Sequence, residues 1–156
     1  MLKTALLASL FAIASQCFAG QVSQFDNEIK LSSQSLASGF VNRGNENLRA
    51  GKYFPALNDF QHASPLLSNF QECKSNVSFL VFFGKVIAYD NLGFHEQCQQ
   101  TMISLLLLVE NREGDSCIFT FDEINTLAEL ATLAPSPNIQ AILLYLCNTI
   151  STSIEN

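Results

Sequence analysis

Apolar residues recur along this chain at the three- and four-residue intervals that are typical of amphipathic helices. Ala56, Phe60 and Ala63 show this spacing, which would place them on one face of a helix. No stretch alternates convincingly between apolar and polar residues, so we expect essentially no β-sheet. The pattern predicts an all-α protein with helices at about residues 36–50, 55–67, 77–92, 95–112, 122–134 and 137–152.

Short turns are expected to join these helices into hairpins. Gly51 suits the residue after a helix end, and Pro55 suits the first turn of the next helix, where its missing N–H costs nothing. Gly93 has the equivalent place after the third helix. Thr120 and Glu123 form a capping-box pattern at the start of the fifth helix. The chain therefore predicts three antiparallel helical hairpins.

The third helix, residues 77–92, is apolar on nearly all sides, so we expect it in the middle of the fold. In the first helix, Gly39 and Gly44 each weaken helix formation by about 1 kcal/mol relative to alanine. A glycine at such a position often lets another helix approach closely. We therefore expect close helix packing against this first helix.

The N-terminus has the pattern of a secretory signal peptide. One lysine precedes a short apolar run, and Cys17 and Ala19 are the small residues of a cleavage site after Ala19. The apolar run is too short to span a bilayer, although an uncleaved anchor is the alternative. We expect a signal peptide at 1–19, an N-terminal segment at 20–35 and one helical domain at 36–156. The protein would then be exported, to the periplasm or outside the cell, without a stable membrane anchor after cleavage.

Charge excludes some classes of partner. The 156 residues are 48% hydrophobic and 14% charged, with a formal net charge of −6 and no basic run. Phosphate binding needs clustered lysine and arginine, so a nucleic-acid partner is not expected. Adhesion to an anionic membrane surface is disfavoured for the same reason.

Residues for catalysis or metal binding are sparse. The two histidines, His62 and His95, lie near predicted helix ends, where solvated or capping roles are usual. His95 and Cys98 could meet on one helical face as a nucleophile pair, although a half-cystine is the favoured role for Cys98. Asp122 and Glu123 point in different directions, so they do not form an acid–base pair. No phosphate-binding, dinucleotide-binding, hydrolase or zinc motif is present, and we expect neither an enzyme nor a cofactor.

The three hairpins can be placed in register at offsets of 42 and 43 residues. The first resembles a tetratricopeptide repeat, with an aromatic and a small residue on its first helix and small–aromatic–small on its second. The resemblance is good over residues 37–70 and weak elsewhere, and three residues depart from the pattern: Arg43, Asn47 and Ser68. The corresponding positions are Phe40, Gly44, Ala56, Phe60 and Ala63; then Phe82, Val86, Cys98, Met102 and Leu105; then Asn125, Glu129, Ala141, Tyr145 and Asn148. An irregular six-helix bundle is the alternative to a short solenoid of this kind.

The resemblance implies a concave groove that is lined by the first helices of the hairpins and binds peptides or partner helices. The groove lacks lysines that could clamp a carboxylate, so an apolar helix or extended segment is the expected ligand. In the alternative interpretation, Phe83, Ile87 and Leu130 are simply core. The residues expected to line the groove are Val41, Asn45, Leu48, Phe83, Ile87, Asp90, Thr126 and Leu130.

Four cysteines remain after the expected signal cleavage: Cys73, Cys98, Cys117 and Cys147. An even count in an exported chain favours two disulfides over four buried thiols. Cys73 and Cys117 lie in equivalent connectors, and Cys98 and Cys147 lie on second helices of adjacent hairpins. We therefore favour the pairs 73–117 and 98–147, with the other two pairings open.

These observations predict an exported protein–protein interaction module. Two other functions remain open. One is a secreted effector or inhibitor with an irregular helical bundle. The other is a small carrier of apolar ligands, enclosed by the apolar residues 77–92 and 103–109.

Overall fold

The computed structural model describes residues 32–69, 74–110 and 119–152. These ranges are helical and contain no strand, so the all-α prediction is confirmed. By their contacts, residues Gln34–Asn156 form one compact unit. The expected signal peptide at 1–19 lies outside the described residues.

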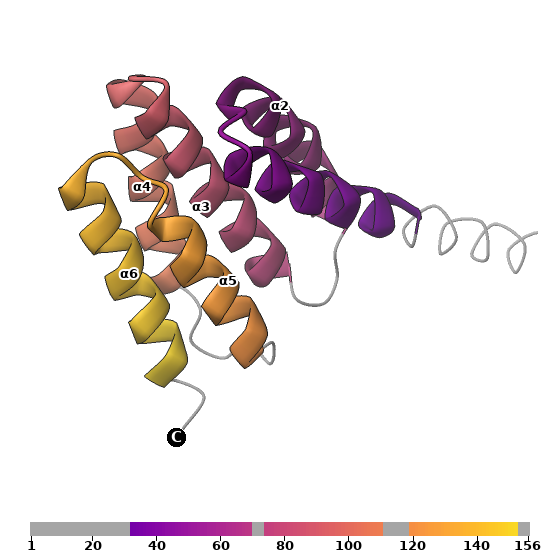
Figure 1. Ribbon diagram of the computed structural model, residues 1–156. Helices are drawn as coiled ribbons and strands as arrows, with labels where there is room; N and C mark the ends of the chain where they lie inside the picture. Colours follow the sequence, from indigo (N-terminus) through magenta and orange to yellow (C-terminus); the bar gives the residue numbers. More distant parts are fainter. Residues whose placement is uncertain (1–31, 70–73, 111–118, 153–156) are drawn as a thin grey trace, which may run out of the picture. The chain divides into compact units, whose positions relative to one another are not determined.

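The helices follow the predicted order (Figure 1). Residues 32–35, which the sequence analysis placed in an N-terminal segment, are already helical. The elements are the N-terminal helix at residues 32–49, α2 at Tyr53–Ala63, the 3-10 helix η1 at Ser64–Asn69, α3 at Lys74–Asn91, α4 at His95–Glu110, α5 at Phe121–Ala131 and α6 at Pro137–Thr152.

Helix α3 is the central element of the unit. It packs against α2, η1, α4 and α5, and it runs between α2 and α4 in Figure 1. Every residue from Asn76 to Asn91 is buried or half-buried. The expectation that this apolar helix lies in the middle of the fold is confirmed, because a helix covered on every side has no face that must be polar.

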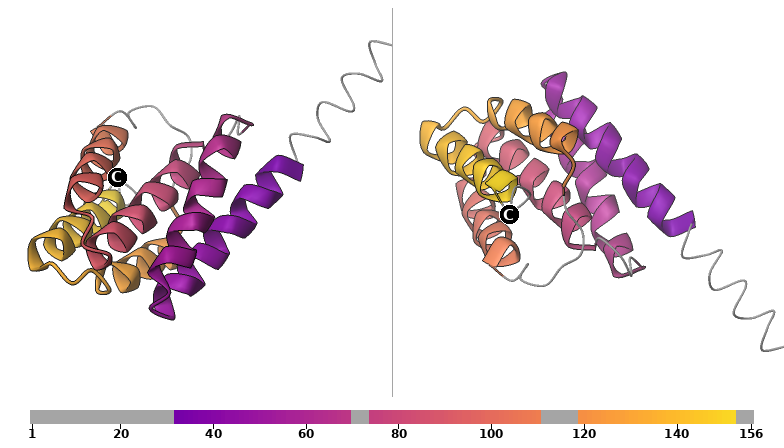
Figure 2. Two further views of the ribbon diagram at one scale, coloured as in Figure 1. Left: turned by 90° about the horizontal axis from the view of Figure 1, so that it is seen from above. Right: turned by 90° about the horizontal axis from the view of Figure 1, so that it is seen from below.

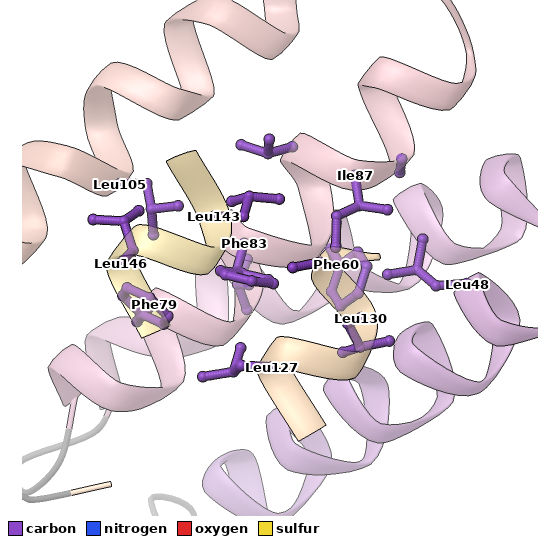
Figure 3. Packing of buried hydrophobic residues seen from close by; sticks show 14 of the residues in the cluster. Leu48, Phe60, Phe79, Phe83, Ile87, Leu105, Leu127, Leu130, Leu143 and Leu146 are labelled. Atoms are coloured by element: carbon purple, nitrogen blue, oxygen red, sulfur yellow. The ribbon is translucent and has the colours of Figure 1, made fainter. Parts of the chain in front are cut away.

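The core gathers side chains from α2, α3, α4, α5 and α6. Figure 3 shows them directed toward one another, with Phe83 near the centre of the cluster. Phe79 packs against Phe83 with ring centroids 5.6 Å apart and meets Phe119 edge-on at 5.3 Å. Leu143 and Leu146 bring α6 into the same cluster.

The two helices of each later hairpin pack on one another. Helix α3 packs on α4, and α5 packs on α6, whose yellow ribbon lies beside the orange α5 in both views of Figure 2. The N-terminal helix and α2 are held together by hydrogen bonds from Arg43 and Asn47 to Asp59.

Phe60 of α2 lies at a close helix crossing. Its ring lies over Gly44 of the N-terminal helix, where an added Cβ would lie 2.7 Å from Phe60 Cε1. The same ring covers Gly84 of α3, and a Cβ on Gly84 would overlap it. The predicted close approach at Gly44 is confirmed, whereas Gly39 has no neighbour near its Cα and allows no such approach. Two glycines therefore form the slot that holds this ring.

The turns after the N-terminal helix and after α3 have the same geometry. Gly51 and Gly93 both adopt left-handed backbone angles, with φ of 69° and 72°. In the first turn the Lys52 N–H donates to the Asn47 carbonyl at 2.8 Å, and in the second the Phe94 N–H donates to the Tyr89 carbonyl at 2.9 Å. These bonds close the helix ends in the way expected for a C-terminal glycine.

The start of α5 confirms the predicted capping box. The Thr120 hydroxyl accepts a hydrogen bond from the Glu123 N–H at 3.3 Å, and Glu123 Oε2 accepts from the Thr120 N–H at 2.7 Å. Two N–H groups that would lack a helical partner are thus satisfied.

The register predicted for the third hairpin is wrong. Helices α2, α4 and α6 begin at Tyr53, His95 and Pro137, so both steps between their starts are equal. An offset of 43 residues from the second hairpin places five exposed residues at the repeat positions of the third: Asn125, Glu129, Ala141, Tyr145 and Asn148. An offset of 42 selects instead five buried or half-buried ones: Ile124, Ala128, Gln140, Leu144 and Cys147. One residue turns a helix by about 100°, enough to move a position from the core to the surface.

Candidate functional site

The residues expected to line a groove belong mostly to the core. Five apolar side chains among them are at most 2% exposed, so no partner reaches them in this structure. The alternative interpretation of Phe83, Ile87 and Leu130 as core therefore describes the structure better. These five residues are Val41, Leu48, Phe83, Ile87 and Leu130.

The expected polar anchors are also turned inward. Asp90 is buried and accepts two hydrogen bonds from Ser136, from the N–H at 3.0 Å and from the hydroxyl at 2.6 Å. Asp90 therefore fixes the start of α6 to the end of α3. Asn45 is 9% exposed, and Thr126 is half-buried. The structure does not bring the eight residues together on an open surface.

Two of the residues that depart from the tetratricopeptide pattern act together. Arg43 donates to both oxygens of Asp59 at 2.6–3.1 Å, and Asn47 Nδ2 donates to Asp59 Oδ2 at 2.9 Å. The Asp59 side chain is 3% exposed, whereas that of Arg43 is 63% exposed. The hydrogen bond and charge of Asp59 raise the pKa of Arg43. A buried carboxylate with this many donors is fully compensated, so the cluster joins two helices.

The predicted disulfide between Cys98 and Cys147 is wrong, because both are free, buried thiols. The Cys98 Sγ donates to the Val86 carbonyl at 3.6 Å, so it faces α3. Helix α4 packs chiefly on α3, which explains why α6 does not offer a partner sulfur. Cys73 and Cys117 lie outside the described residues, and their predicted pairing stays a prediction.

The buried thiols are poor nucleophiles. Burial and the nearby Asp90 carboxylate raise the pKa of Cys98 to about 11, and burial raises the pKa of Cys147 to about 11. An activated cysteine has the opposite shift, because the thiolate is the reactive form. His95, which the sequence placed near Cys98, lies exposed on the first turn of α4. Cys98 acts here as a small core residue.

A lysine and a serine form a second contact that the sequence did not reveal. Lys85 Nζ donates to Ser64 Oγ at 2.6 Å and lies 5.9 Å from the centre of the Phe82 ring. Burial lowers the pKa of this half-buried lysine. The Ser64 hydroxyl donates to the Phe60 carbonyl at 2.9 Å, so its proton is not directed toward the amine. The pair therefore ties η1 to α3 and is not arranged as a serine nucleophile with its base.

The outer side of α4 carries an exposed apolar stripe, which we define as Ile103, Leu106 and Leu107. These side chains are 51%, 37% and 51% exposed. They lie three and four residues apart, so they form one row along the helix. The inner side of the same helix is packed, with Cys98, Met102 and Leu105 buried.

Carboxylates stand at both ends of this row. Glu96 lies seven residues before Ile103, and Glu110 lies three residues after Leu107, on the same side of the helix. Gln100 Nε2 approaches Glu96 Oε1 at 3.4 Å. The structure gives neither glutamate a salt bridge to a cation of the described residues. Within the described residues, the stripe is therefore bounded by two carboxylates that have no ion-pair partner.

A run of leucines in the sequence is a signal for this surface. Residues 105–108 are four consecutive leucines. Consecutive residues on a helix point about 100° apart, so four leucines cannot all face one core. Leu105 is fully buried, and Leu106 and Leu107 are exposed.

Other large apolar residues are exposed singly or in pairs. Ile142 and Tyr145 of α6 are 36% and 67% exposed. Phe54 and Phe94 meet edge-on at 6.0 Å, beside the start of α4. Scattered exposed residues are normal, and the stripe on α4 is set apart by having three in one row.

Neither metal binding nor membrane spanning is supported by the described helices. Among the described residues, no group of three or more metal-binding side chains comes together. In the same part of the chain, every helix is too short or too polar to cross a bilayer.

Comparisons of the chain with protein-family models, with curated proteins and with solved structures gave no match.

Proposed function

We propose that this protein is an interaction module that binds a partner protein through the stripe on α4. The observation that carries the proposal is the exposure of Ile103, Leu106 and Leu107 on a helix whose opposite side is fully packed. Such a row is the surface that a second amphipathic helix covers in helix–helix recognition. The site differs from the groove expected at first, because those residues are buried in the core.

The architecture that we propose is a short stack of three helix pairs, similar to tetratricopeptide repeats. The equal spacing along the sequence between the starts of α2, α4 and α6 supports it. The two matching glycine turns support it as well. Each pair would bury one side against its neighbours and present the outer side of its second helix to partners.

We also propose that the protein is exported and acts in the periplasm or outside the cell. This proposal rests on the signal-like pattern of residues 1–19. The free thiols of Cys98 and Cys147 are compatible with an oxidising compartment, because both are buried and have pKa values of about 11. Determination of the N-terminal residue of the protein recovered from its host would test the cleavage after Ala19.

The binding proposal is tested by selection from a displayed library of helical peptides against the purified protein. The matched variants are a stripe variant, Ile103→Gln/Leu106→Gln/Leu107→Gln, and a control variant on α6, Ile142→Gln/Tyr145→Gln. We expect selected peptides to lose at least tenfold in affinity for the stripe variant, roughly the loss of a few half-buried apolar contacts. They keep their affinity for the control variant.

The outcomes separate the parts of the proposal. Selected peptides that bind the stripe variant as well as the wild type would move the site elsewhere on the protein. A selection that enriches no peptide would overturn the interaction module itself. Circular dichroism of both variants checks that the substitutions leave the helical fold unchanged.

A further inference from the structure

The two halves of the chain differ strongly in charge. After Lys85 the sequence contains a single cation, Arg112, which lies outside the described residues. The described parts of α4, α5 and α6 carry none. Over the same stretch the sequence has nine acidic side chains: Asp90, Glu96, Glu110, Glu113, Asp115, Asp122, Glu123, Glu129 and Glu155. The stripe on α4 therefore lies in a strongly negative half of the protein.

Three of the six carboxylates in the described part of this half have a hydrogen-bond or ion-pair partner within 3.2 Å, whereas Glu96, Glu110 and Asp122 have no ion pair there. Asp90 binds Ser136, Glu123 caps α5, and Glu129 accepts from Arg49 at 3.2 Å. Glu96 has only the long contact to the uncharged Gln100 amide. Glu96 and Glu110 are both exposed. Two of these three described carboxylates thus stand at the two ends of the apolar row, and the third, Asp122, lies on α5.

From this arrangement we infer that the partner is a basic amphipathic helix, an inference that rests on the proposed function. The row from Glu96 to Glu110 has a length of about 21 Å, or roughly four helical turns. A helix lying along it would place apolar residues over Ile103, Leu106 and Leu107. It would place a lysine or arginine near each glutamate, one at each end of its apolar face. Opposite charges at the rim select the partner and its direction, and the apolar row supplies the contact.

Other occupants fit the surface less well. Among the described side chains, a second copy of this chain offers one exposed cation without a carboxylate partner, Lys52, since Arg43 and Arg49 are paired with carboxylates and Lys85 is half-buried. An anionic membrane surface would be repelled by Glu96 and Glu110. The charge at the ends of the row therefore favours a cationic protein segment.

The test uses two synthetic helical peptides, each long enough to cover the row from Glu96 to Glu110, with leucines on one face. One carries lysines at both ends of that face, and its twin carries glutamates at the same positions. Binding to the purified protein is measured by fluorescence anisotropy at low and at high salt. We expect the lysine peptide to bind about tenfold more tightly at low salt, with a smaller ratio at high salt, because exposed ion pairs are weak and screened.

A charge-reversed protein, Glu96→Lys/Glu110→Lys, makes the test specific. We expect it to prefer the glutamate peptide, whereas Asp122→Lys, placed on α5, keeps the wild-type preference. The inference is overturned if the two peptides bind equally, if neither binds, or if the preference does not follow the charge of residues 96 and 110. In the first case peptides chosen from the library can still depend on the stripe, so the proposed function would stand without the basic partner.

Two further measurements address the other occupants. Sedimentation equilibrium of the wild type and the stripe variant shows whether the row joins two copies of the chain. Flotation with vesicles of zwitterionic or anionic lipid shows whether it binds a bilayer. Stripe-dependent self-association or flotation would overturn the inference, and its absence supports a separate protein partner.

Discussion

The crossing at Phe60 and the stripe on α4 are both apolar, but one is closed and the other is open. Phe60 is fully buried because Gly44 and Gly84 leave room for its ring between two helices. Ile103 and Leu107, on the outer side of α4, are half exposed. The difference teaches that the neighbours of an apolar residue, and not its own hydrophobicity, decide whether it stabilises the fold or offers a binding surface.

The largest effect is expected from Phe60→Ala, which empties the closed region. Loss of a fully buried aromatic side chain and the cavity that it leaves lower the free energy of unfolding by about 3–5 kcal/mol. Urea denaturation followed by circular dichroism measures this change. A loss below about 1 kcal/mol would mean that the glycine slot is not a tightly packed part of the core.

A somewhat smaller loss is expected from Gly84→Ala, which fills the slot from the other side. The new methyl group overlaps the Phe60 ring, and overpacking of this kind costs about 3 kcal/mol. Gly39→Ala is the matched control, because nothing lies near its Cα. That change is expected to stabilise the N-terminal helix by about 0.5–1 kcal/mol. Equal effects of the two substitutions would contradict the close approach at Gly84.

The ion pair beside the crossing is expected to respond unequally to removal of its two partners. Arg43→Ala leaves the buried Asp59 carboxylate with Asn47 alone, so the free energy of unfolding is expected to fall. Asp59→Ala leaves the guanidinium in water, where it is already well exposed, and is expected to cost less. Thermal unfolding of both variants at neutral pH gives the comparison. The reverse order would show that Asp59 is not the buried member.

The inner side of α4 is expected to lose stability in alkali. The pKa of the Cys98 thiol is raised from 9.0 to about 11 in the folded protein, so the unfolded chain releases this proton first as the pH rises. The stabilisation is complete below pH 9 and is lost as the pH rises through 11, by about 2 kcal/mol at pH 11. Urea denaturation from pH 8 to 11 measures the slope. Cys98→Ala should reduce the slope and leave the part due to Cys147, whose pKa burial also raises to about 11. An unchanged slope would place the titration elsewhere.

The smallest effect on stability is expected from the open region. Leu107→Gln changes an exposed position, so the free energy of unfolding should stay within about 0.5 kcal/mol of the wild type. Its matched partner on the inner side, Leu105→Gln, buries an amide and should cost several times more. Similar losses in chemical denaturation would show that the outer side of α4 is packed after all.

Local signals predicted the elements of the fold well. The capping box at Thr120 and the turns at Gly51 and Gly93 depend on a few neighbouring residues, which the sequence shows directly. The central place of α3 followed from its lack of a polar face. These features need no knowledge of distant parts of the chain.

Apart from the close approach at Gly44, features that depend on distant residues were not predicted. The third register failed because Ala141 and Tyr145 have the right residue types, one position away from the correct phase. Gly84, which lies against the same Phe60 ring as Gly44, was not singled out. The expected groove residues proved to be mostly core, and the α4 stripe was not singled out as a surface. An apolar row looks alike in sequence whether or not another helix covers it.

The matching turns at Gly51 and Gly93 have a consequence for how such a chain can change in length. Each turn closes with the same pair of backbone hydrogen bonds and is followed, two residues later, by a new helix. A duplication or deletion of the whole segment between these glycines would rejoin the chain at an identical corner. Gene duplication or deletion could therefore add or remove a whole helix pair without changing the turn at the junction. Later substitutions would then need to adapt only the new packing surface.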